Sequence, residues 1–311
     1  MNFNLIKTAI LLIIALIVIP CVAFFIDTKY PLDDLQWNTL VTLFKVMFTA
    51  AMLCFTIGEL TKNCSQVDKL WSVIPVAYVW IVASASMWNE RLVLMAILTS
   101  IWAVRLTYNF SRRGGYSWKF WSGDEDYRWE VLRRNPIFQK VWAWKLFHLL
   151  FISLYQMTLI LLFTLPMIVA WQGGDKPLGI MDYVLSIAMI GGVLLETIAD
   201  QQQWNYQNEK YRRIKAGEAL DANYKKGFID SGLWAKMRHP NYFAEQAIWV
   251  VFYLFSVSAT GRWLNWSMAG PVLLLLLFQG SADFSEGISN EKYPDYKDYI
   301  KRVPRFIPKL F

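Results

Sequence analysis

The sequence predicts an all-α fold, a multi-pass bundle of seven to eight membrane-spanning helices. Of its 311 residues, 56% are hydrophobic and 18% are charged, whereas soluble domains have about 45–50% apolar and about 25% charged residues. The apolar residues occur in long runs, which excludes a disordered chain, a coiled coil and a disulfide scaffold. No Gly-x-Gly-x-x-Gly follows a strand-like segment, so we expect no Rossmann domain.

Eight apolar segments approach the length of about 20 residues that spans a bilayer. They cover residues 6–25, 37–58, 70–88, 91–110, 145–171, 180–200, 242–260 and 264–283. The first could be a signal peptide, but it lacks a small-residue cleavage site and ends at bulky Phe24 and Phe25. We therefore expect a membrane helix there. Only Asn89 and Glu90 separate the third and fourth segments, which predicts a tight helical hairpin.

Lysine and arginine residues gather in three segments. Residues 111–145 and 201–240 hold eight each and residues 284–311 hold six, whereas the alternate connections hold one each. Because cytoplasmic loops are enriched in Lys and Arg, we expect both termini to be cytoplasmic. We expect the bacterial inner membrane, with the endoplasmic reticulum as the alternative. The net charge of +7 then predicts contact with membrane lipids and no nucleic-acid partner, and we expect a monomer.

The sequence predicts no metal centre. The three cysteines, Cys21, Cys54 and Cys64, include no Cys-x-x-Cys pair. The two histidines, His148 and His239, lie far apart in the sequence. A single histidine without a second histidine or a cysteine nearby is a poor metal ligand set.

Four ionisable residues fall inside the predicted spans, namely Lys45, Arg105, Glu196 and Glu245. Such residues are costly in lipid and are candidates for function. Lys45 could instead extend toward the interface, and Arg105 could reach either that interface or a cofactor phosphate. Glu196 begins a polar stripe that includes Asp200, which indicates either a wet cavity or a helix end emerging into water.

A polar motif stands at the predicted start of the seventh span. Pro240 suits the first turn of a helix, so Arg238 and His239 precede free N–H groups that attract phosphate or carboxylate. The alternative is an interfacial cap, in which Arg238 meets lipid headgroups while Asn241 and Tyr242 anchor the helix.

Two further motifs flank the tight hairpin, residues 63–75 before it and residues 105–116 after it. Both belong to the same predicted end of the hairpin, so their side chains could share one pocket. The polar members are Gln66, Asp68, Arg105, Tyr108, Arg112 and Arg113. The alternative, basic loop charge plus a helix cap, explains the paired arginines better than it explains Gln66 and Asp68.

These motifs resemble a known superfamily of membrane enzymes. The stretch L-W-A-K-M-R-H-P-N-Y-F-A-E (233–245), followed by K-Y-P-D-Y-K-D-Y-I-K-R-V-P-R-F-I-P (292–308), is similar to the C-terminal module of membrane steroid and sterol reductases. Isoprenylcysteine carboxyl methyltransferases share a looser version. The stretches N-C-S-Q-V-D-K-L-W (63–71) and R-L-T-Y-N-F-S-R-R-G-G-Y (105–116) resemble the steroid 5α-reductase-like branch. The resemblance covers residues 60–311, which we treat as the reductase-like domain, after N-terminal helices in 1–59.

The resemblance implies NADPH-dependent reduction of a carbon–carbon double bond conjugated to a ketone, as in a 3-oxo-Δ4 steroid or a similar apolar enone lipid. The family's carbonyl-binding acid falls on Asp68. Its glutamine falls on Val67, so Gln66 is a displaced candidate. Its tyrosine falls on Trp102, which cannot serve as a proton donor, so Tyr108 and Tyr78 are the alternative donors.

For the cofactor, the resemblance places an acid at Asp200, a tyrosine at Tyr224 and an asparagine at Asn241. Near the eighth span the family often has basic residues, whereas this chain has Asp283 and Glu286. The expected NADPH-binding residues are Arg105, Arg112, Arg113, Asp200, Tyr224, Arg238, His239, Asn241, Tyr242, Glu286 and Tyr293. The alternative function is an S-adenosylmethionine-dependent lipid or prenyl-cysteine methyltransferase.

Overall fold

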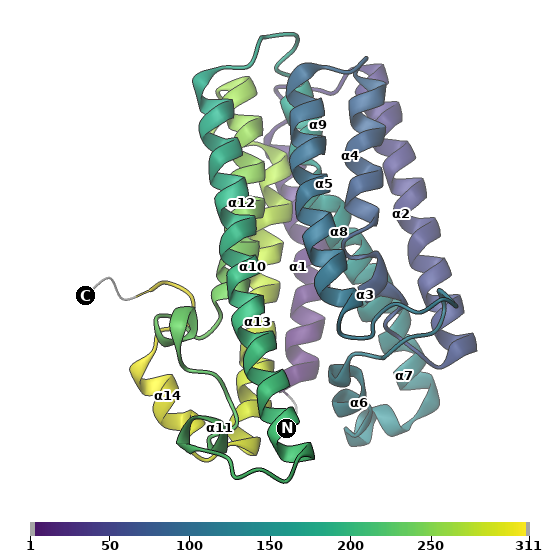
Figure 1. Ribbon diagram of the computed structural model, residues 1–311. Coiled ribbons are helices and arrows are strands. Elements are labelled where there is room, and N and C mark those ends of the chain that lie inside the picture. Colours follow the sequence, from purple (N-terminus) through teal and green to yellow (C-terminus); the bar gives the residue numbers. More distant parts are fainter. Residues whose placement is uncertain (1–3, 309–311) are drawn as a thin grey trace. The chain divides into compact units, whose positions relative to one another are not determined.

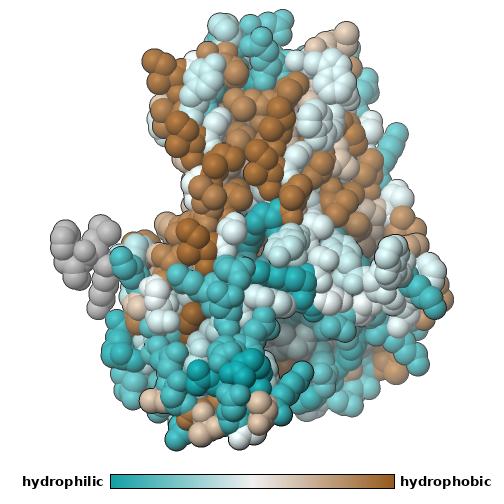
Figure 2. Space-filling view, in the orientation of Figure 1, coloured by the Kyte–Doolittle hydropathy of each residue, from teal (hydrophilic) through white to brown (hydrophobic). Residues whose placement is uncertain are grey.

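The computed structural model describes residues 4–308, and its regular structure over that range is helical (Figure 1). Eight helices there are long and apolar enough to cross a membrane, which confirms the predicted multi-pass helical bundle. Figure 2 shows hydrophobic side chains gathered along the long helices and hydrophilic ones around the short helices between them. Within residues 4–308 the chain forms no strand, so this range contains no Rossmann sheet.

Two compact units divide the chain. Unit 1 comprises residues 1–187 and 249–274, and unit 2 comprises residues 188–248 and 275–311. Three long helices contribute residues to both units: α10 (Ile180–Lys215), α12 (Pro240–Thr260) and α13 (Ala269–Lys292).

Unit 1 contains the first five spans. Its helices are α1 (Asn4–Ile26), α2 (Asp34–Thr61), α3 (Gln66–Leu70), α4 (Ile74–Ala85), α5 (Glu90–Ser111), α6 (Tyr127–Arg133), α7 (Val141–Phe147), α8 (Gln156–Thr164) and α9 (Pro166–Trp171), with the short turns η1 (Pro136–Gln139) and η4 (Trp266–Met268). A stretch of π-helix, η2 (His148–Tyr155), joins α7 to α8. A capping box starts α2, because the Gln36 amide donates to Asp33 Oδ1 over 2.7 Å and Gln36 Oε1 accepts from the Asp33 amide.

The third span differs from the continuous helix that its apolar run predicts. It consists of two helices, α3 and α4, with a turn at residues 71–73 between them. Pro75 stands in the first turn of α4 and cannot donate the hydrogen bond that would continue α3 through this point. Asp68 therefore lies on a separate helix of five residues.

The predicted tight hairpin joins α4 to α5. Met87 and Trp88 have φ values of 55° and 63°, in the left-handed region, and so reverse the chain within a few residues. The Asn89 side chain then caps α5 by accepting from the Arg91 amide over 3.1 Å. The two spans pack side by side, as the short connection predicts.

Unit 2 consists of parts of the three long helices and the polar segments between them. Its short helices are α11 (Ala222–Lys225), η3 (Gly232–Ala235) and α14 (Tyr296–Arg302). A small hydrophobic core holds α14, formed by Phe228, Tyr296, Tyr299 and Val303. The Tyr299 hydroxyl also donates to the Trp234 carbonyl over 2.5 Å, which ties α14 to η3.

Candidate functional site

The segment before the third span is held by a polar loop from farther along the chain. We name residues 114–133 the clasp, because their backbone and side chains bind residues 63–69 at several points. The Asn63 side chain donates to the Gly123 carbonyl over 3.0 Å. The Tyr116 hydroxyl donates to the Lys69 carbonyl over 2.7 Å. The two motifs flanking the hairpin thus lie together, as their spacing predicts.

Gln66 and Lys69 are buried and bind clasp carbonyls. Gln66 Nε2 donates to the Trp121 carbonyl over 2.9 Å. Lys69 Nζ donates to the carbonyls of Phe120 (2.9 Å) and Ser122 (2.8 Å) and to Gln66 Oε1 (3.2 Å). These three acceptors match the three N–H donors of an ammonium group. The Gln66 side chain therefore anchors the clasp, and its expected catalytic role stays a prediction.

Asp68 is half-buried beside the clasp and accepts a hydrogen bond from it. Its Oδ2 lies 3.0 Å from the indole Nε1 of Trp129, a buried side chain on α6. Ser65, on the same segment, accepts at Oγ from the Asp126 amide over 2.9 Å. The neutral indole N–H of Trp129 thus holds the Asp68 carboxyl group.

An ion pair inside the clasp fixes the backbone just before Asp68. Arg133 Nη1 and Nη2 donate to the two oxygens of Glu125 over 2.5 and 2.7 Å. Glu125 Oε1 also accepts from the Cys64 amide over 2.7 Å. Burial raises the pKa of the Cys64 thiol to about 12, although Arg133 partly opposes this effect. Cys64 is therefore a thiol at neutral pH and not a nucleophile.

Asp126 begins α6 and carries a stable negative charge. It caps the helix by accepting from the Arg128 amide over 2.9 Å, and its carboxylate pairs with the Arg128 guanidinium. Burial raises the pKa of Asp126, but the charge and hydrogen bonds of Arg128 outweigh burial and hold that pKa below its usual value. The helix that carries Trp129 is thereby fixed at its first turn.

The other predicted residues of the carbonyl site occupy different environments. Trp102 is completely buried and packs edge-to-face against Trp249, with 4.9 Å between ring centroids. Tyr108 is 65% exposed, and the Arg112 guanidinium lies over its ring. Tyr78 is completely buried, and its hydroxyl has no hydrogen-bond partner. Of the two alternative proton donors, burial favours Tyr78.

The three arginines of the second motif lie at the end of α5 and just after it. Arg105 is on the last turns of the helix, and Arg112 and Arg113 follow its end at Ser111. Arg105 and Arg112 are half-buried, and Arg113 is exposed. The Arg112 Nε donates to Asn109 Oδ1 over 2.9 Å.

In unit 2 the predicted anion-binding motif forms an ion network of its own. Arg238 Nε and Nη2 donate to the two oxygens of Glu286 over 2.8 and 3.3 Å, and His239 Nε2 lies 2.8 Å from Glu286 Oε1. Arg238 Nη1 donates to the carbonyls of Ile300 and Val303. Four of the five N–H donors of Arg238 are thus engaged within the chain.

Backbone hydrogen bonds join the same motif to the C-terminal segment. The Arg238 amide donates to the Pro304 carbonyl over 2.9 Å, and the His239 amide donates to the Arg305 carbonyl over 3.1 Å. Arg305 also pairs with Glu286 over 3.1 Å. The motif before α12 therefore anchors the end of the chain, and a role in binding phosphate stays a prediction.

The other predicted cofactor residues of unit 2 form two small groups. Asn241 Nδ2 donates to Asp200 Oδ1 over 3.2 Å, which joins the polar stripe of α10 to the motif at the start of α12. Tyr242 stacks on His239 with ring centroids 5.1 Å apart. Tyr224 stacks on Tyr206 near α11, also at 5.1 Å.

Tyr293 is half-buried and packs against Gly227. Gly227 has a φ of 86°, and a Cβ there would lie 2.2 Å from the tyrosine ring. Only glycine suits this position, for both conformational and steric reasons.

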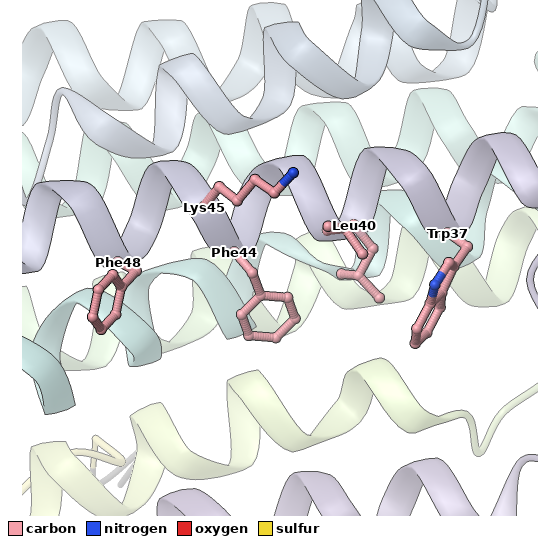
Figure 3. Close-up of a pocket in the computed structure, with 6 residues that line it drawn as sticks. Trp37, Leu40, Phe44, Lys45 and Phe48 are labelled. Carbon is pink, nitrogen blue, oxygen red and sulfur yellow. The ribbon is translucent and has the colours of Figure 1, made fainter.

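A shallow apolar groove of about 370 Å³ runs along α2 and contains one of the predicted intramembrane charges (Figure 3). Its lining residues are Trp37, Leu40, Val41, Phe44, Lys45 and Phe48. Lys45 is exposed near the middle of the span, where its stem can extend along apolar surface. Apart from Lys45, none of the candidate functional residues lines this groove.

Two clasp residues that bind the candidate acid segment were not predicted from the sequence, Trp129 and Glu125. Both stand in a polar segment of ordinary composition, and no spacing relates them to Asp68, 61 and 57 positions earlier. Among the residues that the structure describes, no group of three or more His, Cys, Asp or Glu side chains could hold a metal ion.

Comparisons with known proteins place this chain among relatives of undetermined activity. A family model described as Protein of unknown function (DUF1295) matches residues 54–303. An uncharacterized protein of Schizosaccharomyces pombe, C594.04c, is 35% identical over 296 residues, which cover 91% of this chain and 84% of the yeast protein. No solved structure matches the chain. Because the family model covers most of the sequence, including both hairpin motifs and the motif before α12, the chain belongs to the DUF1295 family.

Proposed function

We propose that this protein is an NADPH-dependent membrane reductase that reduces the C4–C5 double bond of 3-oxo-Δ4 steroids or of a similar apolar enone lipid. The observation that carries the proposal is the environment of Asp68. Its carboxyl group is half-buried at the start of an apolar span and is held by the neutral indole N–H of Trp129. A carboxylic acid in such a place can hydrogen-bond to the oxygen of a developing enolate.

The proposed reaction adds a hydride to the β-carbon, which leaves an enolate, and the α-carbon then takes up a proton from solvent, so the double bond becomes single. Bound NADPH would supply the hydride. Asp68 polarises the carbonyl by donating a hydrogen bond to its oxygen. Tyr78 is the second candidate donor of a hydrogen bond to this carbonyl oxygen, because its hydroxyl is buried without a hydrogen-bond partner. The apolar spans around these groups exclude water and suit a steroid-like substrate.

Residues present in unit 2 have the chemistry that NADPH needs. The side-chain oxygens of Gln203 and Asn290 are buried without a hydrogen-bond partner, and ribose hydroxyls or a carboxamide N–H could satisfy such acceptors. Asp200 and Asn241 hydrogen-bond to each other and are further candidate partners for a polar cofactor. We assign cofactor binding to these residues of unit 2 and to Tyr224 and Tyr293. The guanidinium groups of Arg105, Arg112 and Arg113 in unit 1 suit phosphate, and their role in binding it stays a prediction.

Purified protein in detergent should oxidise NADPH when testosterone or progesterone is added. Asp68→Ala removes the carboxyl group and should lower kcat about 10²–10³-fold, the cost of losing one donor to a developing oxyanion. NADPH affinity, measured by fluorescence titration, should not change. Asp298→Ala is the matched control, because Asp298 is exposed on α14. The proposal fails if no enone lipid supports turnover, and binding of S-adenosylmethionine without NADPH would favour a methyltransferase.

A further inference from the structure

The hydrogen bond between Trp129 and Asp68 has a direction that its chemistry dictates. An indole N–H can only donate, so Asp68 Oδ2 must be the acceptor of the 3.0 Å bond. If the acid is neutral, as proton donation to a carbonyl requires, its proton cannot point toward Trp129. Because the carbonyl oxygen of a neutral carboxyl group is a better acceptor than its hydroxyl oxygen, this bond favours a proton on Oδ1.

Trp129 reaches Asp68 from a helix that is fixed at both ends. Asp126 caps the first turn of α6 and also binds Ser65 through its amide. At the last turn, Arg133 pairs with Glu125. The Trp129 side chain itself is only 6% exposed, so its ring has little freedom to turn. The donor is thus already in place before any substrate binds.

We propose that Trp129 is a positioning residue, which fixes Asp68 Oδ2 as an acceptor and so leaves Oδ1 as the oxygen that donates to the substrate carbonyl. This inference rests on the proposed enone reduction. It assigns the clasp a role in the reaction, because the clasp carries Trp129 as well as the contacts to Gln66 and Lys69. Trp129 itself need not touch the substrate.

The direct test removes the indole N–H and leaves an aromatic ring, although a smaller one, at position 129. Trp129→Phe should lower kcat for a 3-oxo-Δ4 steroid about 10- to 100-fold, the effect of losing one hydrogen bond to a group that bears or develops charge. The KM for the steroid and the affinity for NADPH should stay unchanged, because the role proposed for Trp129 acts through Asp68 and not through contact with either ligand. Trp118→Phe is the matched control, since Trp118 lies in the same clasp and is fully exposed.

A second variant guards against misfolding of Trp129→Phe. Incorporation of β-(3-benzothienyl)alanine at position 129 replaces the N–H with sulfur and conserves the shape of the ring. It should give the same loss of kcat with an unchanged thermal unfolding temperature. If this isosteric variant keeps the wild-type kcat, the positioning role is overturned.

Infrared spectroscopy provides a readout that does not need turnover. The carboxylic-acid C=O stretch of Asp68 is identified as the band that disappears in Asp68→Asn. In the variant without the N–H, this band should move to higher frequency, because its C=O oxygen loses a hydrogen bond. An unmoved band, or the lack of any acid band in the wild type, contradicts the inference. A shifted band in a protein that reduces no enone would instead overturn the proposed function and keep the hydrogen-bond assignment.

Discussion

Asp68 in unit 1 and Glu286 in unit 2 are both acids beside motifs that resemble those of membrane reductases, yet their partners differ in kind. Asp68 accepts from a neutral indole N–H and is half-buried. Glu286 is buried and pairs with Arg238, His239 and Arg305. A carboxylate surrounded by cations is held in its charged form. An acid bound by neutral donors can still gain and lose a proton.

The cations near the two acids also bind different parts of the chain. The network around Glu286 uses its cations to attach the C-terminal segment, through the carbonyls of Ile300 and Val303 as well as through Arg305. The segment around Asp68 keeps its cation, Lys69, turned to the carbonyls of the clasp. We infer that the first arrangement serves stability and the second serves the reaction.

The largest expected effect is on the stability of unit 2. Glu286→Gln leaves Arg238 and His239 buried beside a neutral amide and should lower the free energy of unfolding by about 3–5 kcal/mol. The measurement is denaturant unfolding in detergent micelles. Asp298→Asn is the control, because its pair with Lys301 is exposed and should contribute at most about 1 kcal/mol. If both substitutions lowered the free energy of unfolding equally, the buried network around Glu286 would be no more stabilising than the exposed Asp298–Lys301 pair.

The substitution Arg238→Lys tests whether Arg238 holds the C-terminal segment in place or binds the cofactor. A lysine cannot keep the two-pronged pairing with Glu286 together with both carbonyl contacts, so the free energy of unfolding should fall by about 1.5–3 kcal/mol. The dissociation constant for NADPH, measured on the folded fraction, should stay the same. Weaker NADPH binding at unchanged stability would show that the predicted phosphate role is correct and that the comparison drawn above is not.

Features set by local sequence could be predicted well. Apolar runs predict the eight spans, and the Asn89–Glu90 connection predicts the hairpin, because length and composition decide both. The neighbourhood of residues 63–75 and 105–116 follows from that hairpin, and Ser72 and Thr107 indeed lie 2.7 Å apart. Pro75 also indicates the break between α3 and α4, because proline lacks a backbone N–H. The continuous apolar run around it nevertheless favours one unbroken helix.

Contacts that use backbone acceptors could not be predicted. Gln66 and Lys69 bind carbonyls of Phe120, Trp121 and Ser122, and every residue type has such a carbonyl. The same holds for Arg238. Its cationic side chain predicts an anionic partner, but that partner could equally be a carboxylate of the chain or a bound phosphate. Only tertiary structure decides which acceptor a buried donor meets.

A smaller effect concerns the acid sensitivity of the clasp. The folded-state pKa of Asp126 lies below its unfolded value, because Arg128 outweighs burial. Its contribution to stability is therefore present above the unfolded pKa of about 3.9 and is lost as the pH falls through the folded pKa. Asp126→Asn should flatten this part of the curve of unfolding free energy against pH. Asp175→Asn, at an exposed site in unit 1, should leave the curve in place. Identical curves for Asp126→Asn and the wild type would mean that Arg128 does not hold the carboxylate.

The smallest expected effect belongs to an exposed ion pair at α6, between Glu130 and Arg134. Arg134 lies 2.6 Å from Glu130 on α6, closer than Trp129 lies to Asp68, but both partners are more than 60% exposed. Water competes for exposed charges, so an exposed pair one helical turn apart contributes only about 0.3–0.5 kcal/mol. Glu130→Gln should therefore leave steroid turnover at its wild-type rate and change the unfolding free energy by no more than that amount. If it reduced turnover as much as Trp129→Phe does, any disturbance of α6 would suffice to impair Asp68. The indole N–H would then have no special part in holding the acid.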